Sequence, residues 1–358
     1  MFLNSPTKSK SLSDAANYSL SKLAVTRLRR NRLAAASLCY FIIIIALCYI
    51  GPILYSLSPH AQVLALDTTL PFTRVNLVEV RYDEAKETPD EVTTFPDFLE
   101  VYAINGETDV AALAKEGALE INGVYFKQIE RFHLLGTDSK GRDLLARILH
   151  GGRISLGVAF LATLTALVIG LSYGTVSGFL GGKVDTFMMR IVDILYALPF
   201  IIFVILLMVL FEGFEYKILL VFLAIGAIEW LTMARIVRGQ VLHLKKQEFI
   251  IAAQATGASF FRIMTKHLAP NLIGPVIVYS TLLIPAVMLL EATLSFLGLG
   301  MQAHSASWGT LIHEGQETMH SSPWQLIAPS LFFSSTLFAM NILGDGLRDA
   351  LDVKSAKD

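Results

Sequence analysis

The residues that could do chemistry in this chain are scattered and do not form a catalytic set. One acid, Glu291, follows an apolar run that contains Pro275 and Pro285. An ionisable side chain in such surroundings is a functional candidate because its burial is costly. We expect Glu291 either to make a structural hydrogen bond or to contact the amine of a substrate on a transport pathway.

The histidines do not indicate a metal site. His243 and His267 have no partner at ligand spacing. His313 with Glu314 lacks the second histidine of a zinc-protease helix. We therefore expect neither a metal ion nor a catalytic residue.

Redox, nucleotide and nucleic-acid sites are not indicated either. Cys39 and Cys48 share one apolar stretch, about 13 Å apart along a helix, and cannot bond to each other within it. The stretch from Gly178 to Lys183 has the wrong glycine spacing for a phosphate loop, and Val184 replaces the required Ser or Thr. Because no lysine-rich patch is evident, we expect no nucleic acid, and we expect no cofactor.

The composition indicates a protein that lies largely in lipid. Of the 358 residues, 54% are hydrophobic and only 16% are charged, and the formal net charge is −1. These fractions exclude an ordinary soluble domain.

Six apolar runs are long enough to be membrane-spanning helices. The first, Leu33–Leu57, would extend about 37 Å as a helix, which is well beyond the apolar core of a secretory signal, so we interpret it as an uncleaved anchor. The other five carry few or no charges: Ile154–Leu180, Ile194–Phe211, Ile218–Ala234, Leu272–Leu294 and Leu326–Leu343. The predicted fold is an all-α polytopic membrane protein with six transmembrane helices.

Basic residues set the predicted orientation. The arm over residues 1–32 is rich in Lys and Arg, and the loop over 235–271 is basic, with Glu248 as its acid. Both segments should therefore lie in the cytoplasm. With an even number of spans, the tail over 344–358 returns to that side, after a five-helix core over 154–343.

The acid-rich segment 58–132 is expected on the external, periplasmic side. Within it Arg74–Tyr82 alternates like a strand and Asp109–Leu119 has helical composition, so we expect a small α/β insert. The insert is either a surface addition, tolerated because a longer loop costs little closure entropy, or a docking element for a solute-binding protein.

An amphipathic helix lying on the outer membrane surface is predicted over residues 133–153. Thr137 and Asp138 can cap it, and its leucine and isoleucine side chains share one face. The charged residues Arg142 and Arg147 should point away from that face. Such a helix is typical of the membrane interface.

Glycine recurs at every fourth position of the second span, at Gly170, Gly174, Gly178 and Gly182. This spacing lines one flank of a helix with residues that let another backbone approach closely. It predicts helix packing, and it is a weak indicator of function.

The cytoplasmic loop predicts a helix, a break and a second helix. Ala252 and Ala253 keep the first helix slim, and Gly257 can end it in the left-handed conformation. Ser259 can then cap the second helix, which Pro270 should stop.

A slim, exposed helix of this kind suits a groove in a partner protein. Small side chains let the main chain settle deeply, while Phe249, Ile250, Phe260 and Phe261 could supply apolar anchors. The alternative is an amphipathic loop that lies on lipid head groups.

The same loop resembles the signature of a known family. Ile251-Ala252-Ala253, Gly257 and Pro270 have the spacing of the cytoplasmic motif of binding-protein-dependent ABC importer permeases, with Ile251 in place of the leading Glu. More specifically, the chain is similar to the second permease subunit of dipeptide and oligopeptide importers. Four further segments carry this resemblance: His133–Asp138 with Gly141–Asp143, Leu294–Gly300, Ser307–Gly309 and Gly344–Asp352.

The resemblance implies the fold of a type I ABC importer permease in a bacterial inner membrane. It also implies a homologous second permease, two cytoplasmic ATP-binding subunits that hydrolyse ATP, an external solute-binding protein and a peptide substrate. This subunit itself would carry out no catalysis. The coupling helix and its flanks would contact the ATPases through Glu248, Ile251, Ala252, Ala253, Gly257, Ser259 and Pro270.

Other functions are less well supported by the pattern. Related permeases carry nickel or oligosaccharides, which are alternative solutes. A secondary transporter would need charged relays within several spans or an inverted repeat. An intramembrane enzyme would need paired Asp or Ser and His side chains in facing spans. Neither pattern is apparent.

Overall fold

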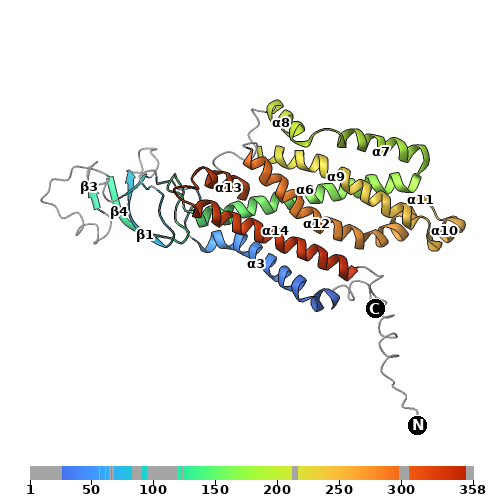
Figure 1. Cartoon of the computed structure of the whole chain (residues 1–358), viewed down its shortest axis with the longest axis horizontal. Helices are drawn as coiled ribbons and strands as arrows, with labels where there is room; N and C mark the ends of the chain where they lie inside the picture. Colours follow the sequence, from blue (N-terminus) through green and yellow to red (C-terminus); the bar gives the residue numbers. More distant parts are fainter. Residues whose placement is uncertain are drawn as a thin grey trace, which may run out of the picture. The chain divides into compact units, whose positions relative to one another are not determined.

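The computed structural model of the chain is mostly helical and contains one small sheet (Figure 1). It describes residues 26–351 except 56, 61, 64–65, 67, 83–90, 95–118, 122–123, 212–216 and 298–305. The chain forms two compact units. The first comprises residues 1–44, 156–294 and 334–358, and the second comprises residues 45–155 and 295–333.

The helices are α3 (Arg32–Leu54), α6 (Leu144–Leu180), α7 (Gly182–Tyr196), α8 (Phe200–Leu210), α9 (Lys217–Leu244), α10 (Glu248–Ala255), α11 (Phe260–Ile263), the π-helical turn η1 (Met264–Leu268), α12 (Ala269–Phe296), α13 (Trp308–Glu317) and α14 (Trp324–Leu351). The strands are β1 (Thr73–Tyr82), β2 (Glu91–Thr94), β3 (Leu119–Ile121) and β4 (Val124–His133).

Four helical stretches of the described chain are long and apolar enough to cross a membrane, and five are if the bent pair α7–α8 counts as one span. The four are α3, α6, the stretch 260–296 that ends with α12, and α14. The predicted span 218–234 lies within α9, which is not among these candidates. By length and composition, the predicted count of six is therefore not reached in the described chain.

The predicted span Ile194–Phe211 is not one continuous helix. Within it α7 ends at Tyr196 and α8 begins at Phe200, with a bend of 77° between the two helices. The break falls at Pro199, which has no N–H for the helical ladder and disfavours helical backbone at the residue before it. The prediction of one straight span was wrong because uniform apolarity masked this break.

The separate amphipathic helix predicted over 133–153 is also wrong, because α6 runs uninterrupted into the following span. Gly151 and Gly152 could have broken it, at a cost of about 1 kcal/mol each in a helix interior. Both are instead needed for packing. A Cβ atom on Gly151 would lie 3.0 Å from the Ala306 carbonyl oxygen, and one on Gly152 would lie 2.7 Å from the Trp308 ring.

A four-stranded antiparallel sheet in the order β2-β1-β4-β3 belongs to the second unit. β1 and β4 pair along their full length. The strand predicted for Arg74–Tyr82 is confirmed as β1. The helix predicted for Asp109–Leu119 lies outside the described residues, apart from Leu119, which begins β3. Leu77 of β1 is fully buried and packs against Val63.

In the first unit, α6 and α9 pack with their backbones in close approach. A Cβ atom added to each of three glycines of α6 would lie within 3.0 Å of a side-chain Cβ atom of α9. The pairs are Gly170 with Met233, Gly174 with Val237 and Gly178 with Val241. The predicted glycine packing is confirmed for these three positions, whereas a Cβ on Gly182 would meet nothing within 4 Å. Because the residue numbers rise together, the two helices run parallel.

α7 lies beside α9 and is tied to it by a two-pronged ion pair (Figure 1). Nε and Nη2 of Arg238 donate to the two carboxylate oxygens of Asp185, each at 2.6 Å. Ser177 of α6 donates its hydroxyl proton to the same carboxylate. Three helices of the first unit are therefore joined at one acid, which is a strong arrangement because both of its oxygens are engaged.

We predict that Gly174→Ala destabilises the protein and that Gly239→Ala does not. The new methyl group at position 174 would collide with the Ala234 carbonyl oxygen, whereas a Cβ on Gly239 would meet nothing within 4 Å. Overpacking of this kind costs about 1–3 kcal/mol. Thermal unfolding in detergent, followed by tryptophan fluorescence, measures the difference, and equal unfolding temperatures for the two variants would contradict the close approach.

Candidate functional site: the exposed helix α10 and its support

The backbone ends α10 with a defined glycine cap. Gly257 has φ = +77°, a left-handed conformation that glycine adopts without strain. The N–H groups of Gly257 and Ala258 donate to the carbonyl oxygens of Gln254 and Ala253, each at 3.0 Å. This is the Schellman pattern, which satisfies carbonyl groups left open at a helix end. The predicted left-handed break at Gly257 is confirmed.

The segment after the break starts a new helix as predicted. The Ser259 side chain accepts a hydrogen bond from the Arg262 backbone N–H at 3.4 Å, so Ser259 is the N-cap of α11. The helical path then continues through η1 into α12.

Pro270 does not stop this helix, so that prediction is wrong. Pro270 is the second residue of α12, directly after the π-helical turn η1. In that turn the Ala269 N–H donates to the Met264 carbonyl oxygen, five residues back. The π-helical turn shifts the backbone hydrogen bonds from four to five residues back just before Pro270. The missing N–H of proline is therefore accommodated, and the helix continues past Pro270.

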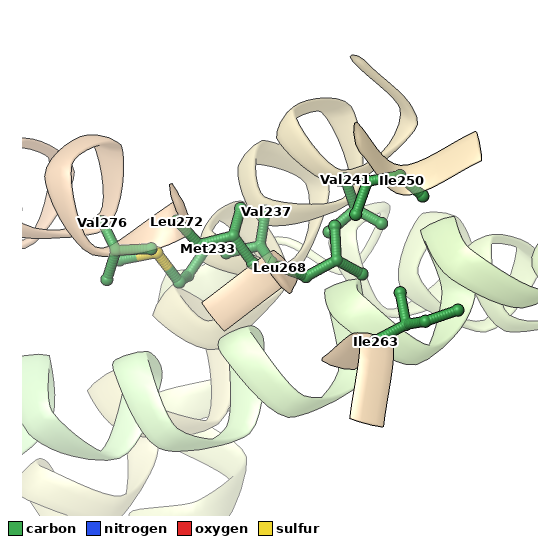
Figure 2. Close-up of a cluster of buried hydrophobic side chains, with 8 residues drawn as sticks. All are labelled: Met233, Val237, Val241, Ile250, Ile263, Leu268, Leu272 and Val276. Carbon is green, nitrogen blue, oxygen red and sulfur yellow. The ribbon is translucent and has the colours of Figure 1, made fainter. Parts of the chain in front are cut away.

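α10 rests on a buried apolar cluster that we call the α10 seat (Figure 2). Ile250 is its contribution from α10 and is fully buried. The other members come from α9, α11, η1 and α12: Met233, Val237, Val241, Ile263, Leu268, Leu272 and Val276. Ile250 is therefore an anchor within this chain, not the partner-facing anchor that the sequence suggested.

The other side of α10 is open. Ile251 is 53% exposed and Phe249 is 41% exposed, and Ala252 is exposed as well. The α10 surface, which we define as Glu248, Phe249, Ile251, Ala252 and Ala255, thus combines two large apolar side chains with small ones. This composition suits docking of a partner, because small residues admit a close approach and large ones supply buried area.

Polar contacts hold the base of α10 in place. The Lys245 ammonium donates to the Phe179 carbonyl oxygen at 2.7 Å, close to the C-terminal end of α6. A cation near a helix C-terminus is favourable because it meets the negative end of the helix dipole. Rings of Phe179 and Phe260 also pack edge to face, with centroids 5.0 Å apart. The segments on either side of α10 are thus each held to α6 by one of these contacts, through Lys245 before α10 and through Phe260 after it.

The second unit contains a buried charged cluster that the sequence did not predict. Asp138 accepts hydrogen bonds from Nε of Arg142 at 2.7 Å and from Nη1 of Arg147 at 2.6 Å. Arg147 also donates to Glu314 of α13. Asp138 and both arginines are buried. Paired charges of this kind are costly to break, because removing one partner leaves the other uncompensated in the interior.

These contacts correct one expectation for this segment. Asp138 does not cap a helix, since Asp143 takes that place by accepting the Ala146 N–H at 2.7 Å. The sequence placed Arg142 and Arg147 off the apolar face without indicating partners for them. Both side chains are buried and paired with the nearby Asp138 and with the distant Glu314.

Trp308 joins two of the sequence motifs within the second unit. Its indole Nε1 donates to the Ile148 carbonyl oxygen at 2.9 Å, and its backbone N–H donates to the Ser155 hydroxyl at 3.2 Å. The preceding Ser307 forms a capping box with Thr310 at the start of α13. The motif residues around 307–309 therefore fix α13 against the first turns of α6.

The two acids that lie within the predicted spans differ in their surroundings. Glu291 on α12 is 2% exposed. Glu229 on α9, which the sequence analysis did not single out, is half-buried. A charge within a predicted span was the signal that could have identified it. In the described part of the chain, no group of three or more His, Cys, Asp and Glu side chains could hold a metal ion.

Comparison with known proteins gives two family matches. Residues 166–357 match the family described as "Binding-protein-dependent transport system inner membrane component". Residues 19–71 match the "N-terminal TM domain of oligopeptide transport permease C". The first match contains α10 and all the residues of its seat.

Curated relatives agree with these matches. The oligopeptide transport system permease protein OppC of Haemophilus influenzae is 51% identical over 226 residues, which cover 63% of this chain and 72% of the relative. OppC of Escherichia coli K12 is 54% identical over 226 residues, 63% of this chain and 74% of that protein. The dipeptide transport system permease protein DppC of Bacillus subtilis is 48% identical over 223 residues, 62% of this chain and 69% of that protein.

We predict that Ile250→Ala loosens α10 and that Ile251→Ala does not. The first change empties part of the α10 seat and should cost about 2–5 kcal/mol of local stability, whereas Ile251 is mostly exposed. Hydrogen exchange of the α10 amides, measured by mass spectrometry, should accelerate in the Ile250 variant alone. Equal exchange in both variants would show that the seat does not hold the helix.

Proposed function

The chain belongs to the family of binding-protein-dependent transport system inner membrane components, and from this premise we propose that it is the permease subunit of an ATP-driven peptide importer. Relatives at about half identity are named as oligopeptide and dipeptide transport permeases, which supports peptides over nickel or oligosaccharides. The same relatives disfavour a secondary transporter. The observation that carries the proposal is the exposed α10 surface, which is fixed on a buried seat within the matched region.

We infer the partners from this family membership. A second, homologous permease would complete the translocation pathway, and an extracytoplasmic solute-binding protein would deliver the peptide. Two ATP-binding subunits would hydrolyse ATP, so that this subunit carries no catalytic residue. This division of labour between subunits suits the present chain, because the buried contacts of the α10 seat hold the exposed helix α10 in place.

We propose α10 and its flanks as the coupling helix that contacts one ATPase. Its outward residues would enter a groove, and Gly257 and Ser259 would set the angle at which the following helix departs. Closure of the ATPases on ATP would push α10 and bias the permease pair between inward-open and outward-open states, which requires a different contact in each state. The proposed contact and positioning residues are Glu248, Ile251, Ala252, Ala253, Gly257, Ser259 and Pro270.

We also propose six membrane crossings with both termini in the cytoplasm. The bent pair α7–α8 would make one crossing, and α9, with 28 residues, would extend about 42 Å and could make another. The basic arm over 1–32 and the basic loop over 235–271 support this orientation in an inner membrane. The segment 58–132 would then face the solute-binding protein.

Glu291 fits a structural role better than a pathway role. At 2% exposure its carboxyl group is enclosed by the protein, and a substrate amine could reach it only after a rearrangement. We therefore propose that it stabilises the end of α12, which was one of the two roles expected from the sequence.

We predict that Ala252→Trp reduces peptide uptake about tenfold or more, while Ala252→Ser leaves it near the wild-type level. Ala252 is exposed, so the indole should not disturb folding, but it would hold a partner groove away from the α10 main chain. A tenfold loss corresponds to about 1.4 kcal/mol of contact energy. Uptake of a radiolabelled tripeptide into cells that depend on this chain measures the effect. Normal uptake by the tryptophan variant, at equal membrane abundance, would refute the coupling role of α10.

A further inference from the structure

Glu229 lies level with the middle of the apolar run of α6, as the packing of α9 on α6 shows. A Cβ atom on Gly226 would lie 3.6 Å from Thr165, and one on Gly170 would lie 2.6 Å from Met233. Glu229 lies between Gly226 and Met233 on α9, so it is level with residues 166–169 of α6. That stretch, Ala-Leu-Val-Ile, is central in the charge-free run over 154–180.

The carboxyl group of Glu229 is half-buried, and within the described chain it has neither a hydrogen bond nor an ion pair. Its environment differs from that of the other acids described above. Asp185 is engaged by Arg238 and Ser177, and Asp138 is engaged by two arginines. Glu229 is thus an ionisable group, level with the middle of an apolar run, that no side chain of the described fold pairs with.

Facing lipid would be an unfavourable position for this group. A charged side chain at the centre of a spanning helix costs about 2.5–3.5 kcal/mol on insertion scales, and such residues generally face the bundle interior or a water-filled cavity. If the chain forms half of a pathway with a second permease, as proposed above, the open side of Glu229 faces that pathway.

The cargo supplies a complementary charge. A peptide with a free amino terminus carries an α-ammonium group with three donors, and a carboxylate binds such a cation through charge-assisted hydrogen bonds. A site near the membrane midplane is where transporters of other kinds also hold their substrates. A single acid on one flank would bind weakly enough to release the peptide.

We propose that Glu229 is a pathway residue that binds the α-ammonium group of the peptide during translocation. The inference rests on the proposed peptide import and adds a specificity-determining contact to it. It assigns this contact to α9, whereas the sequence offered such a contact only as one of two roles for Glu291 on α12.

The test compares Glu229→Gln, which removes the charge, with Glu229→Asp, which keeps it, in the full transporter with its binding protein. We expect uptake of a radiolabelled tripeptide to fall about tenfold in the Gln variant and to stay within about threefold of the wild type in the Asp variant. Glu317→Gln serves as a matched control, because Glu317 is exposed on α13 and should leave uptake unchanged.

A second arm identifies the group that Glu229 binds. Both peptides are tested at concentrations at which the wild type transports them. For the N-acetylated tripeptide, which lacks the α-ammonium group, uptake by the Gln variant should stay within about twofold of wild-type uptake. An equal fall for both peptides, unchanged uptake in the Gln variant, or equal losses in the Gln and Asp variants would each overturn the proposal. Loss of the second permease from the purified Gln variant would do so too, since it would assign Glu229 to the subunit contact. A wild-type chain that supports no peptide uptake would instead refute the proposed function itself.

Discussion

The close approach of α6 and α9 is the constraint on which the first unit depends. Three glycines on α6 let the α9 backbone come near enough to place Met233, Val237 and Val241 in fixed positions. Those three side chains are the part of the α10 seat that α9 contributes, and Ile250 rests with them. The same approach aligns Arg238 with Asp185, so that α7 joins the assembly through an ion pair. The glycine contacts between α6 and α9 therefore determine the position of the exposed helix α10.

Buried charge follows one rule in the two units, and Glu229 departs from it. Asp185 in the first unit and Asp138 in the second are each satisfied by arginine, because an isolated charge in the interior would be costly. Glu229 has no such partner in the described chain. The α10 surface departs from the matching rule for apolar groups, because its large apolar side chains are exposed and not buried. Both departures are explained if this chain works as one part of a larger assembly, with a partner on α10 and a cargo on Glu229.

Local signals predicted the parts of the structure that local chemistry decides. Gly257 takes the left-handed conformation, Ser259 caps α11, and three of the four regularly spaced glycines contact a helix, as their types and spacing indicated. Features were missed where distant residues meet, and where a proline acts in a way that composition does not reveal. The bend at Pro199 was hidden by uniform apolarity, and the pairing of Arg147 with Glu314 of α13 joins residues 167 positions apart. Pro270 was misjudged because a π-helical turn can accommodate a proline that would end an ordinary helix.

The most direct test of the account is a crosslink from α10 to the ATPase in native membranes. A cysteine at the exposed Gln254, with Cys39 and Cys48 replaced, carries a short photoreactive crosslinker, and the tagged chain is then purified. Arg74→Cys is the matched control, because the Arg74 side chain is exposed near the start of β1. The account predicts that an ATP-binding subunit is joined to position 254 and not to position 74. A crosslink from position 254 to an external binding protein, or a chain that purifies alone after crosslinking, would contradict both the coupling role of α10 and the cytoplasmic placement of its loop.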